Sequence, residues 1–320
     1  MTRALGAAAP SLERSTRIAL LCPGQGAQAV GMGMPWVSRS ARAKGVFTLA
    51  SEILGFDLLK LCAEGPAEKL TRTDVCQPAI LATSAACLAA LEEEKRLDPA
   101  QVHVALGLSL GEYTALLAAG VLGLADALRL VRLRGVAMQE ASDRAPSGMT
   151  SVIGITPAEA AEVCAAATAG GGVCVVANLN SPGQVVLSGD LDSLARAEAI
   201  AAERGFRRSV RLDVAGAFHS PLMEPARRRL EEAIATTEFS PARFPVIGNV
   251  DGVPATDPKI LRKNLVRQLT SPVLFEASLR RAIADGASKF VELSPGRVLC
   301  GLVKKIDRTL PREASDGGES

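Results

Sequence analysis

The sequence predicts an α/β protein that carries an inserted second subdomain. Its 320 residues are 48% hydrophobic but only 3% aromatic and include 29 glycines, which is typical of a core packed from alanine, leucine and valine. Short aliphatic or β-branched runs alternate with longer stretches of helical periodicity, as in a sheet covered by helices. The length allows one large domain with an insertion, or two domains. The order of predicted strands and helices changes between residues 147 and 214, which indicates the insertion.

In the first part of the chain, two buried strands are each followed directly by a glycine-rich turn, at 17–22 and at 102–106. Helical periodicity predicts the segments around them, and Pro78 is expected to begin one of these helices because proline favours the first helical turn. The predicted helices are 36–54, 78–94, 112–119 and 125–142.

Residues 147–214 are expected to form the inserted subdomain. Strands are predicted at 149–155, 173–177, 184–188 and 208–214, and helices at 156–168 and 190–204. Their order, βαββαβ, is that of a ferredoxin-like unit and is complete within about 65 residues, a normal size for a small domain.

The larger pattern then resumes with helices at 221–235, 258–269 and 275–284, strands at 244–249 and 289–293, and a short helix reaching residue 306. The large subdomain is therefore expected to comprise 17–146 and 215–307. A disordered leader is expected at 1–16, and a flexible tail is expected at 308–320, where the residues are polar.

Charge and cysteine content exclude several classes of protein. Lys and Arg number 36 against 34 Asp and Glu, a net charge of +2 without a long basic run, so nucleic acid is a poor partner. The longest apolar stretch, 79–91, is well short of the roughly 20 residues that cross a bilayer. Seven scattered cysteines without a C-x-x-C pair favour neither disulfides nor a zinc site. We expect reduced thiols, no metal and a cytoplasmic location.

A nucleophile elbow is indicated by Gly107-x-Ser109-x-Gly111 between a predicted strand and a predicted helix. Small residues are needed two positions either side because the serine lies on a sharp, strained turn. The elbow would hold the hydroxyl forward at the carboxyl end of a parallel sheet, and the N–H of Leu110 would face a developing oxyanion. The pattern also occurs by chance, so an ordinary tight turn stays open as an alternative.

Only two histidines could serve as the base that a serine nucleophile needs. His219 lies in a loop between a strand and a helix, where catalytic residues are often placed. His103 lies in the apolar strand before the elbow, about six residues from Ser109, too far along an extended chain for its ring to reach the hydroxyl. His219 is the candidate base by elimination, and His103 is expected to be a packed or rim histidine.

Seven blocks spread over about residues 17–307 carry a resemblance to a known family. They are PGQGAQ (23–28), GLSLGEY (107–113), RGVAMQ (134–139), AFHSPLM (217–223), NVDG (249–252), RQLTSPV (267–273) and ELSPGRVL (292–299). In this order they resemble the malonyl-CoA:acyl carrier protein transacylases. Several blocks in register are far more specific than the elbow alone.

The resemblance implies an α/β-hydrolase-like large subdomain and a ping-pong reaction. Ser109 would attack the thioester of malonyl-CoA and form a malonyl-enzyme ester, and the malonyl group would pass to the phosphopantetheine thiol of acyl carrier protein. His219 would take the serine proton and return it to the departing thiol. Malonyl-CoA is the substrate and no cofactor is implied. We expect a monomer, without a membrane partner, that supplies fatty acid synthesis.

The family also implies how the histidine and the oxyanion are held. Its members lack a carboxylate beside the histidine and orient the imidazole through a backbone carbonyl, which corresponds here to Gln268. The oxyanion would lie between the N–H of Leu110 and the N–H of Gln25, so the first glycine-rich turn must expose its backbone.

Arg134 is the residue that the resemblance assigns to the malonyl carboxylate, since a guanidinium holds a carboxylate bidentately. Its neighbours Arg129 and Arg132 do not match the family pattern and are expected to be surface charges. Phe218 resembles the malonyl-selective form of its loop, because a bulky ring leaves no room for an α-methyl branch.

Asn178 and Asn180, in a predicted turn of the small subdomain, are expected at a lip of the cleft between the subdomains and are further binding candidates. The family usually has His where this sequence has Leu108, which changes the polarity of the pocket but does not remove the base. A basic cluster at 204–211 is a candidate docking surface for the carrier protein, because carrier proteins are usually acidic.

Two other functions stay open. A discrete, trans-acting acyltransferase of a polyketide assembly line would share every motif. A catalytically weak interaction protein that kept the fold is disfavoured by the intact serine, histidine and arginine. A simple serine hydrolase is weaker still, because it needs no clamp for a carboxylate.

Overall fold

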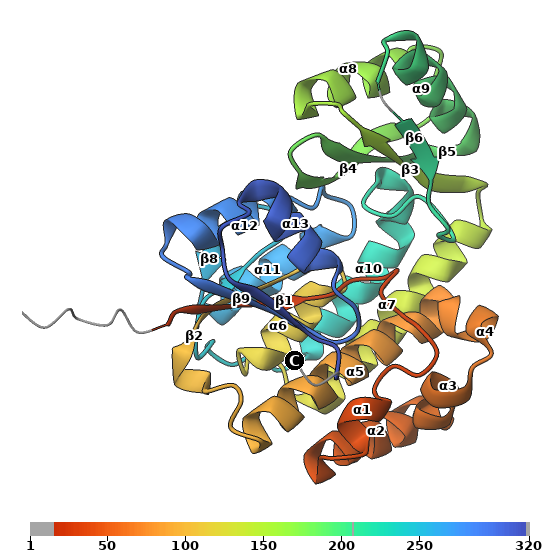
Figure 1. The fold of residues 1–320 in the computed structure, drawn as a ribbon. Helices are drawn as coiled ribbons and strands as arrows, with labels where there is room; N and C mark the ends of the chain where they lie inside the picture. The colour runs from red at the N-terminus through yellow and green to blue at the C-terminus, as the bar shows by residue number, and fades with distance from the viewer. Residues whose placement is uncertain (1–15, 207, 318–320) are drawn as a thin grey trace, which may run out of the picture.

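The chain folds around two sheets in a computed structural model that describes residues 16–206 and 208–317 (Figure 1). The predicted leader lies outside the described residues except for Thr16. One sheet has six strands in the order β10-β9-β1-β2-β7-β8 and the other has four in the order β4-β5-β3-β6. Strands from before and after the small sheet build the large one, so the predicted α/β class with an inserted unit is confirmed.

The large sheet is parallel except for its β7–β8 edge. Its strands are β1 (Ile18–Cys22), β2 (Val102–Gly107), β7 (Val246–Ile247), β8 (Pro254–Ala255), β9 (Lys289–Leu293) and β10 (Arg312–Ser315). β1 is central and wholly buried, and its side chains alternate between two helical layers. Leu20 packs in the first layer and Leu21 in the second. The aliphatic sequence of β1 satisfies both faces.

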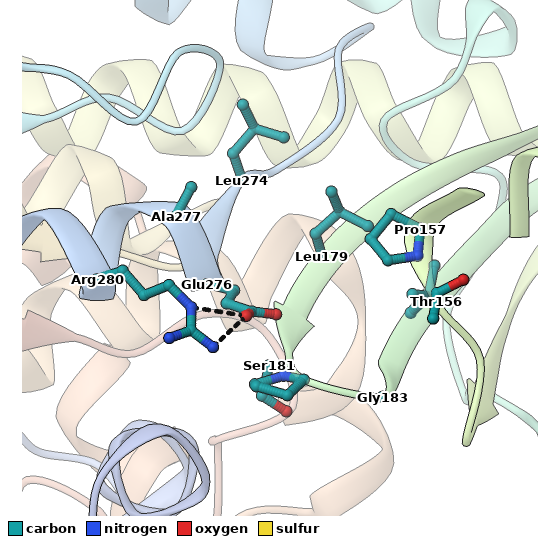
Figure 2. Close-up of a pocket in the computed structure, with 11 residues that line it drawn as sticks. Thr156, Pro157, Leu179, Ser181, Gly183, Leu274, Glu276, Ala277 and Arg280 are labelled. Atoms are coloured by element: carbon teal, nitrogen blue, oxygen red, sulfur yellow. Dashed lines mark hydrogen bonds and ion pairs between the residues drawn. The ribbon is translucent and has the colours of Figure 1, made fainter. Parts of the chain in front are cut away.

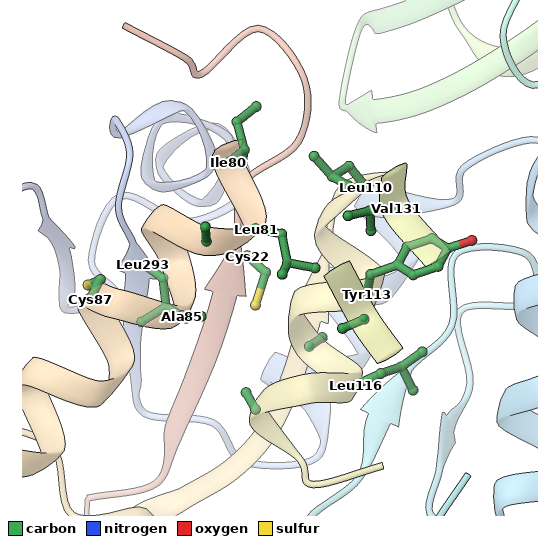
Figure 3. Close-up of a cluster of buried hydrophobic side chains, with 14 of the residues drawn as sticks. Cys22, Ile80, Leu81, Ala85, Cys87, Leu110, Tyr113, Leu116, Val131 and Leu293 are labelled. Atoms are coloured by element: carbon green, nitrogen blue, oxygen red, sulfur yellow. The ribbon is translucent and has the colours of Figure 1, made fainter. Parts of the chain in front are cut away.

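Helices form these two layers. The first layer contains α1 (Met34–Val37), α2 (Ala41–Leu54), α3 (Leu58–Glu64), α4 (Ala67–Thr71), α5 (Thr73–Glu93), α6 (Gly111–Ala118), α7 (Leu124–Asp143), α10 (Glu224–Thr236) and α11 (Pro258–Gln268). The second contains α12 (Phe275–Ala284) and α13 (Val298–Ile306). Single 3₁₀ turns occur at Pro99–Gln101 and Pro221–Met223. In the first layer, α5 and α6 meet around Cys22 at the end of β1, as Figure 3 shows.

The predicted helix at 36–54 is two helices, because α1 ends at Val37 and α2 begins only after Ser40. Its backbone is extended, and its hydroxyl accepts the N–H of Ala43 as an N-cap. The helix predicted from Pro78 begins earlier, at Thr73, and keeps Pro78 inside. Proline cannot donate to the carbonyl of Asp74 four residues back, and the guanidinium of Arg132 donates to that carbonyl instead.

Helix α5 has 21 residues and is long and apolar enough to cross a membrane by length and composition alone. In the fold, 89% of its apolar window is buried inside the protein. It packs against α2 and α7 and serves as the central helix of the first layer. Its hydropathy is therefore accounted for by the core.

The small sheet has the ferredoxin-like arrangement that the sequence predicts. Its elements are β3 (Ser147–Ile153), α8 (Pro157–Ala167), β4 (Cys174–Ser181), β5 (Gln184–Asp190), α9 (Leu191–Glu203) and β6 (Arg208–Arg211). All its strand pairs are antiparallel, and the first and third strands of the unit lie side by side at its centre. Both helices pack on one face of this sheet around a separate core.

The tail expected at 308–320 differs from the structure, because β10 at Arg312–Ser315 pairs in parallel with β9 and extends the large sheet. The segment is polar, which hid it from a search for hydrophobic runs. Its Glu313 pairs with Lys289 on β9 at 2.8 Å, and its last residue, Ser315, is buried. An edge strand can be polar because one side of it faces solvent.

Candidate active site

Ser109 lies where β2 ends and α6 begins, and its backbone is strained. Its φ of 53° is in the left-handed region, which a non-glycine residue rarely adopts. A Cβ on Gly107 would come within 2.0 Å of the backbone of Gly111, and a Cβ on Gly111 within 2.0 Å of the carbonyl oxygen of Cys22. The two glycines therefore permit the close approach of strand, turn and helix that the predicted elbow requires.

His219 meets the serine across the site. Its Nε2 lies 2.7 Å from Ser109 Oγ, and its Nδ1 lies 2.9 Å from the backbone oxygen of Gln268. Because a carbonyl only accepts, Nδ1 carries the hydrogen and Nε2 is left to accept the serine proton. Burial, together with the charge of Arg134, lowers the pKa of His219 to about 4. The imidazole is therefore neutral at pH 7 and ready to act as a base.

Arg134, on α7, is a buried cation whose partners are all neutral. It is 1% exposed, and it donates to Gln77 Oε1 at 2.8 Å, Ser109 Oγ at 2.9 Å and Gln268 Oε1 at 3.3 Å. Its Nε has no partner among the described residues. Burial lowers the pKa of the guanidinium below its usual value. A buried charge without a carboxylate in contact favours an anionic ligand.

Two backbone N–H groups predicted to hold an oxyanion, those of Gln25 and Leu110, donate to no protein acceptor within residues 16–206 and 208–317. The turn before Gln25 is forced close to the elbow, since a Cβ on Gly24 would lie 2.4 Å from the carbonyl oxygen of Leu108. The role of the two N–H groups as an oxyanion hole stays a prediction.

A buried polar network, which was not predicted from the sequence, fixes the backbone of the elbow. Asn249 accepts the N–H of Ser109 at 2.8 Å and donates to the carbonyl of Gly107 at 2.7 Å. Glu112 accepts the N–H of Asn249 at 3.1 Å. Both residues lie in the blocks that carry the family resemblance. The sequence signal that could have indicated this network is Glu112, a glutamate inside an otherwise apolar helix.

A cavity of about 270 Å³ opens onto Ser109 and brings most of the predicted residues together. Its lining from the predicted set is Gln25, Ser109, Arg134, Asn178, Asn180, Phe218 and His219. The remaining lining is apolar and consists of Leu108, Met138, Met149, Val186, Leu212, Val214 and Val298. Leu110 and Gln268 lie behind this wall and do not line the cavity. The two asparagines lie on β4 rather than in a turn.

A larger cavity of about 370 Å³ lies on the other side of β4. Leu179 lines this cavity, whereas its neighbours Asn178 and Asn180 line the first one. Figure 2 shows it between the start of α8, the end of β4 and helix α12. Its charged groups, Glu276 and Arg280, pair with each other at 2.8 Å. It contains no serine–histidine pair, so we place the chemistry in the first cavity.

The other candidates lie away from the site. His103 lies against the guanidinium of Arg17 and the carbonyl of Asp285, as a rim histidine. Arg129 pairs with Asp126, and Arg132 pairs with Asp74. Among the described residues no group of three His, Cys, Asp or Glu could hold a metal ion, and all seven cysteines are buried free thiols.

A strained serine on an elbow, a neutral histidine and a buried arginine in an α/β fold fit an enzyme of acyl transfer. The family model described as the acyl transferase domain matches residues 19–316. Malonyl CoA-acyl carrier protein transacylase of Bacillus subtilis is 41% identical over 92% of both chains. This chain therefore belongs to the malonyl-CoA:acyl carrier protein transacylase family.

Solved structures agree with this membership. An acyl carrier protein S-malonyltransferase from Vibrio cholerae superposes with a TM-score of 0.88 at 41% identity, covering 93% of this chain and 96% of the other. A malonyl-transacylase in complex with its type II PKS acyl-carrier protein superposes with a TM-score of 0.89 at 36% identity, covering 93% and 96%.

Proposed function

We propose that this protein transfers malonyl from malonyl-CoA to the phosphopantetheine thiol of acyl carrier protein, through a malonyl ester on Ser109. The observation that carries the proposal is the buried guanidinium of Arg134, 2.9 Å from Ser109 Oγ and without a carboxylate partner among the described residues. A malonyl ester on that oxygen has a free carboxylate a few bonds away. The carboxylate supplies the direct contact with a negative charge that the arginine lacks.

The first half-reaction forms an ester and releases CoA. Ser109 Oγ attacks the thioester carbon while His219 Nε2 takes its proton, and the oxyanion accepts the N–H groups of Gln25 and Leu110. Collapse of the tetrahedral intermediate breaks the C–S bond, and the imidazolium returns the proton to the departing thiolate. The carrier-protein thiol then reverses these steps as the second nucleophile.

No cofactor enters these steps, because nucleophile, base, oxyanion donors and carboxylate clamp are all side chains or backbone of one chain. For the same reason a monomer suffices. The free thiols fit the reducing conditions of the cytoplasm.

The basic cluster at 204–211 has less support as a docking surface for the carrier protein. Arg204 pairs with Glu162 at 3.0 Å and Arg211 pairs with Glu198. Arg208 is the member of this cluster, within the described residues, for which no ion pair is found. Two of the charges are thus already balanced on the protein surface.

The carrier protein of fatty acid synthesis is the first candidate acceptor, and a polyketide carrier is the second. The second is favoured by the likeness to a malonyl-transacylase solved with its type II PKS acyl-carrier protein. Transfer rates to one carrier protein of each type, at equal concentration, decide between them.

Mass spectrometry of the intact protein tests the proposal. Incubation with malonyl-CoA should add one malonyl group, and addition of holo carrier protein should remove it. Ser109→Ala should abolish the adduct, while Ser220→Ala, which changes a buried serine on the same loop as His219, serves as a control and should keep it. A malonyl ester on the Ser109→Ala protein, or hydrolysis of the wild-type ester much faster than its transfer, would contradict the proposal.

A further inference from the structure

Glu112 is a buried carboxylate directly behind the nucleophile, and the mechanism above does not use it. It lies in the first turn of α6 and is 1% exposed. Its Oε2 accepts from Gln268 Nε2 at 2.7 Å and from the N–H of Asn249 at 3.1 Å. Its Oε1 has no partner among the described residues. A carboxylate with one unsatisfied oxygen is costly in a core, which suggests a purpose beyond packing.

The side chain of Gln268 links this carboxylate to the site. Its Nε2 donates to Glu112 and, at 2.9 Å, to the carbonyl of Ser109, while its Oε1 accepts from Arg134 at 3.3 Å. An amide can satisfy these partners in only one orientation, because Arg134 only donates and the carboxylate accepts. Glu112 therefore fixes the side chain whose backbone oxygen also orients His219.

Glu112 is also the acidic group nearest in the hydrogen-bond network to Arg134, one amide away. Burial raises the pKa of its carboxyl to about 7, the two hydrogen bonds and Arg134 lower it, and Asp251 raises it. Among the described residues, the titratable or charged groups that face this network are Arg134 from α7, Cys76 from α5, Tyr113 from α6, Asp251 from the turn after β7 and His219 from its loop. Burial raises the pKa of Tyr113 and lowers the pKa of His219, so both pKa values move away from pH 7.

We propose that Glu112 is a positioning residue that acts through Gln268 as the exchangeable counter-charge of Arg134. While the acyl pocket is empty it is partly ionised at pH 7, and it takes up a proton from solvent when an acyl carboxylate binds Arg134. One negative charge thus replaces another next to the guanidinium, and no covalent bond other than the new O–H is made. This inference rests on the proposed transfer of malonyl.

The selectivity between an anionic and a neutral acyl group tests the exchange. The ratio of kcat/KM for malonyl-CoA to that for acetyl-CoA cancels the contribution of CoA. In the wild type this ratio should fall about tenfold between pH 6 and pH 8.5, because ionised Glu112 opposes a second negative charge. Glu112→Gln keeps an acceptor oxygen for Gln268 and Asn249 but never ionises, so its ratio should stay at the acid value of the wild type throughout.

Glu292→Gln is the matched control. Glu292 is also a wholly buried carboxylate, but its oxygens accept N–H groups of Leu299 and Cys300 in α13, away from Arg134. This variant should keep the wild-type dependence of the ratio on pH. A ratio that is flat in the wild type, or that falls equally in Glu112→Gln, would overturn the proposal.

A measurement on the wild type alone keeps the proposal testable if the variant does not fold. Malonyl loading at pH 7 in weakly buffered solution with an indicator dye should consume a fraction of a proton per ester, and acetyl loading none. No uptake with malonyl, while the malonyl ester on Ser109 is seen by mass, would reject the role of Glu112 and leave the proposed function standing. Failure to form that ester would instead reject the proposed function.

Discussion

Replacing Arg134 by alanine should cost malonyl loading far more than acetyl loading. A malonyl carboxylate on this guanidinium would make two charge-assisted hydrogen bonds worth about 1.5–3 kcal/mol each, together about 3–6 kcal/mol. Binding displaces the present contact of Arg134 with Ser109 Oγ at 2.9 Å, worth about 1 kcal/mol. The net loss of about 2–5 kcal/mol corresponds to a roughly 30- to 4,000-fold lower kcat/KM for malonyl-CoA. Acetyl-CoA loses none of the carboxylate contact.

Rapid-quench measurement of labelled acyl-enzyme gives kcat/KM for both substrates. Arg129→Ala is the matched control, because Arg129 lies on the same helix but is exposed and pairs with Asp126. The control should leave both values within about twofold, as expected for an exposed ion pair. Thermal unfolding checks that the Arg134 variant is folded. An equal loss for malonyl and acetyl in a folded variant would show that Arg134 is structural and would refute the reasoning.

Two further predictions concern the base and the size of the pocket. Because the pKa of His219 is depressed to about 4, the imidazole loses its base form only as pH falls through that value. The kcat/KM for malonyl loading should therefore stay nearly level from pH 6 to 5 and halve near pH 4; an acid limb centred near 6.5 would contradict the depressed value. Phe218→Ala should raise the ratio of methylmalonyl to malonyl loading about tenfold, since one methyl group in a pocket is worth at least that much, and competition between the two CoA esters measures it. An unchanged ratio would assign Phe218 to the core alone.

The local parts of the site could be predicted from the sequence because their chemistry is written in neighbouring residues. Gly107 is required by a steric contact within the same turn, and Gly111 by its close approach to the end of β1 at Cys22. The assignment of His219 followed from having only two histidines, and the structure places its Nε2 2.7 Å from Ser109 Oγ. The backbone oxygen of Gln268 came from the family resemblance and lies 2.9 Å from the imidazole.

The parts that escaped prediction depend on contacts between distant segments. Glu112 meets Asn249 and Gln268 across 137 and 156 residues of sequence, so no local pattern indicates that these side chains satisfy one another. The start of α5 escaped for the same reason, since Arg132 replaces the hydrogen bond that Pro78 cannot make. Strand β10 was not predicted because an edge strand forms by pairing with a distant strand, here β9, and can lack hydrophobic residues.

Leu108 connects the apolar lining of the pocket to its selectivity. Among the described residues that line the cavity, Arg134 is the only one that carries a charge at pH 7, and most of the others are aliphatic, sulfur-containing or aromatic. A low-polarity wall strengthens the attraction between the guanidinium and a carboxylate, because little solvent or dipole competes with it. A leucine in place of the histidine usual in the family removes one further polar group from this wall. We therefore expect discrimination between malonyl and a neutral acyl group to depend on a single cation, and the proposed charge of Glu112, one amide away from it, to change this discrimination.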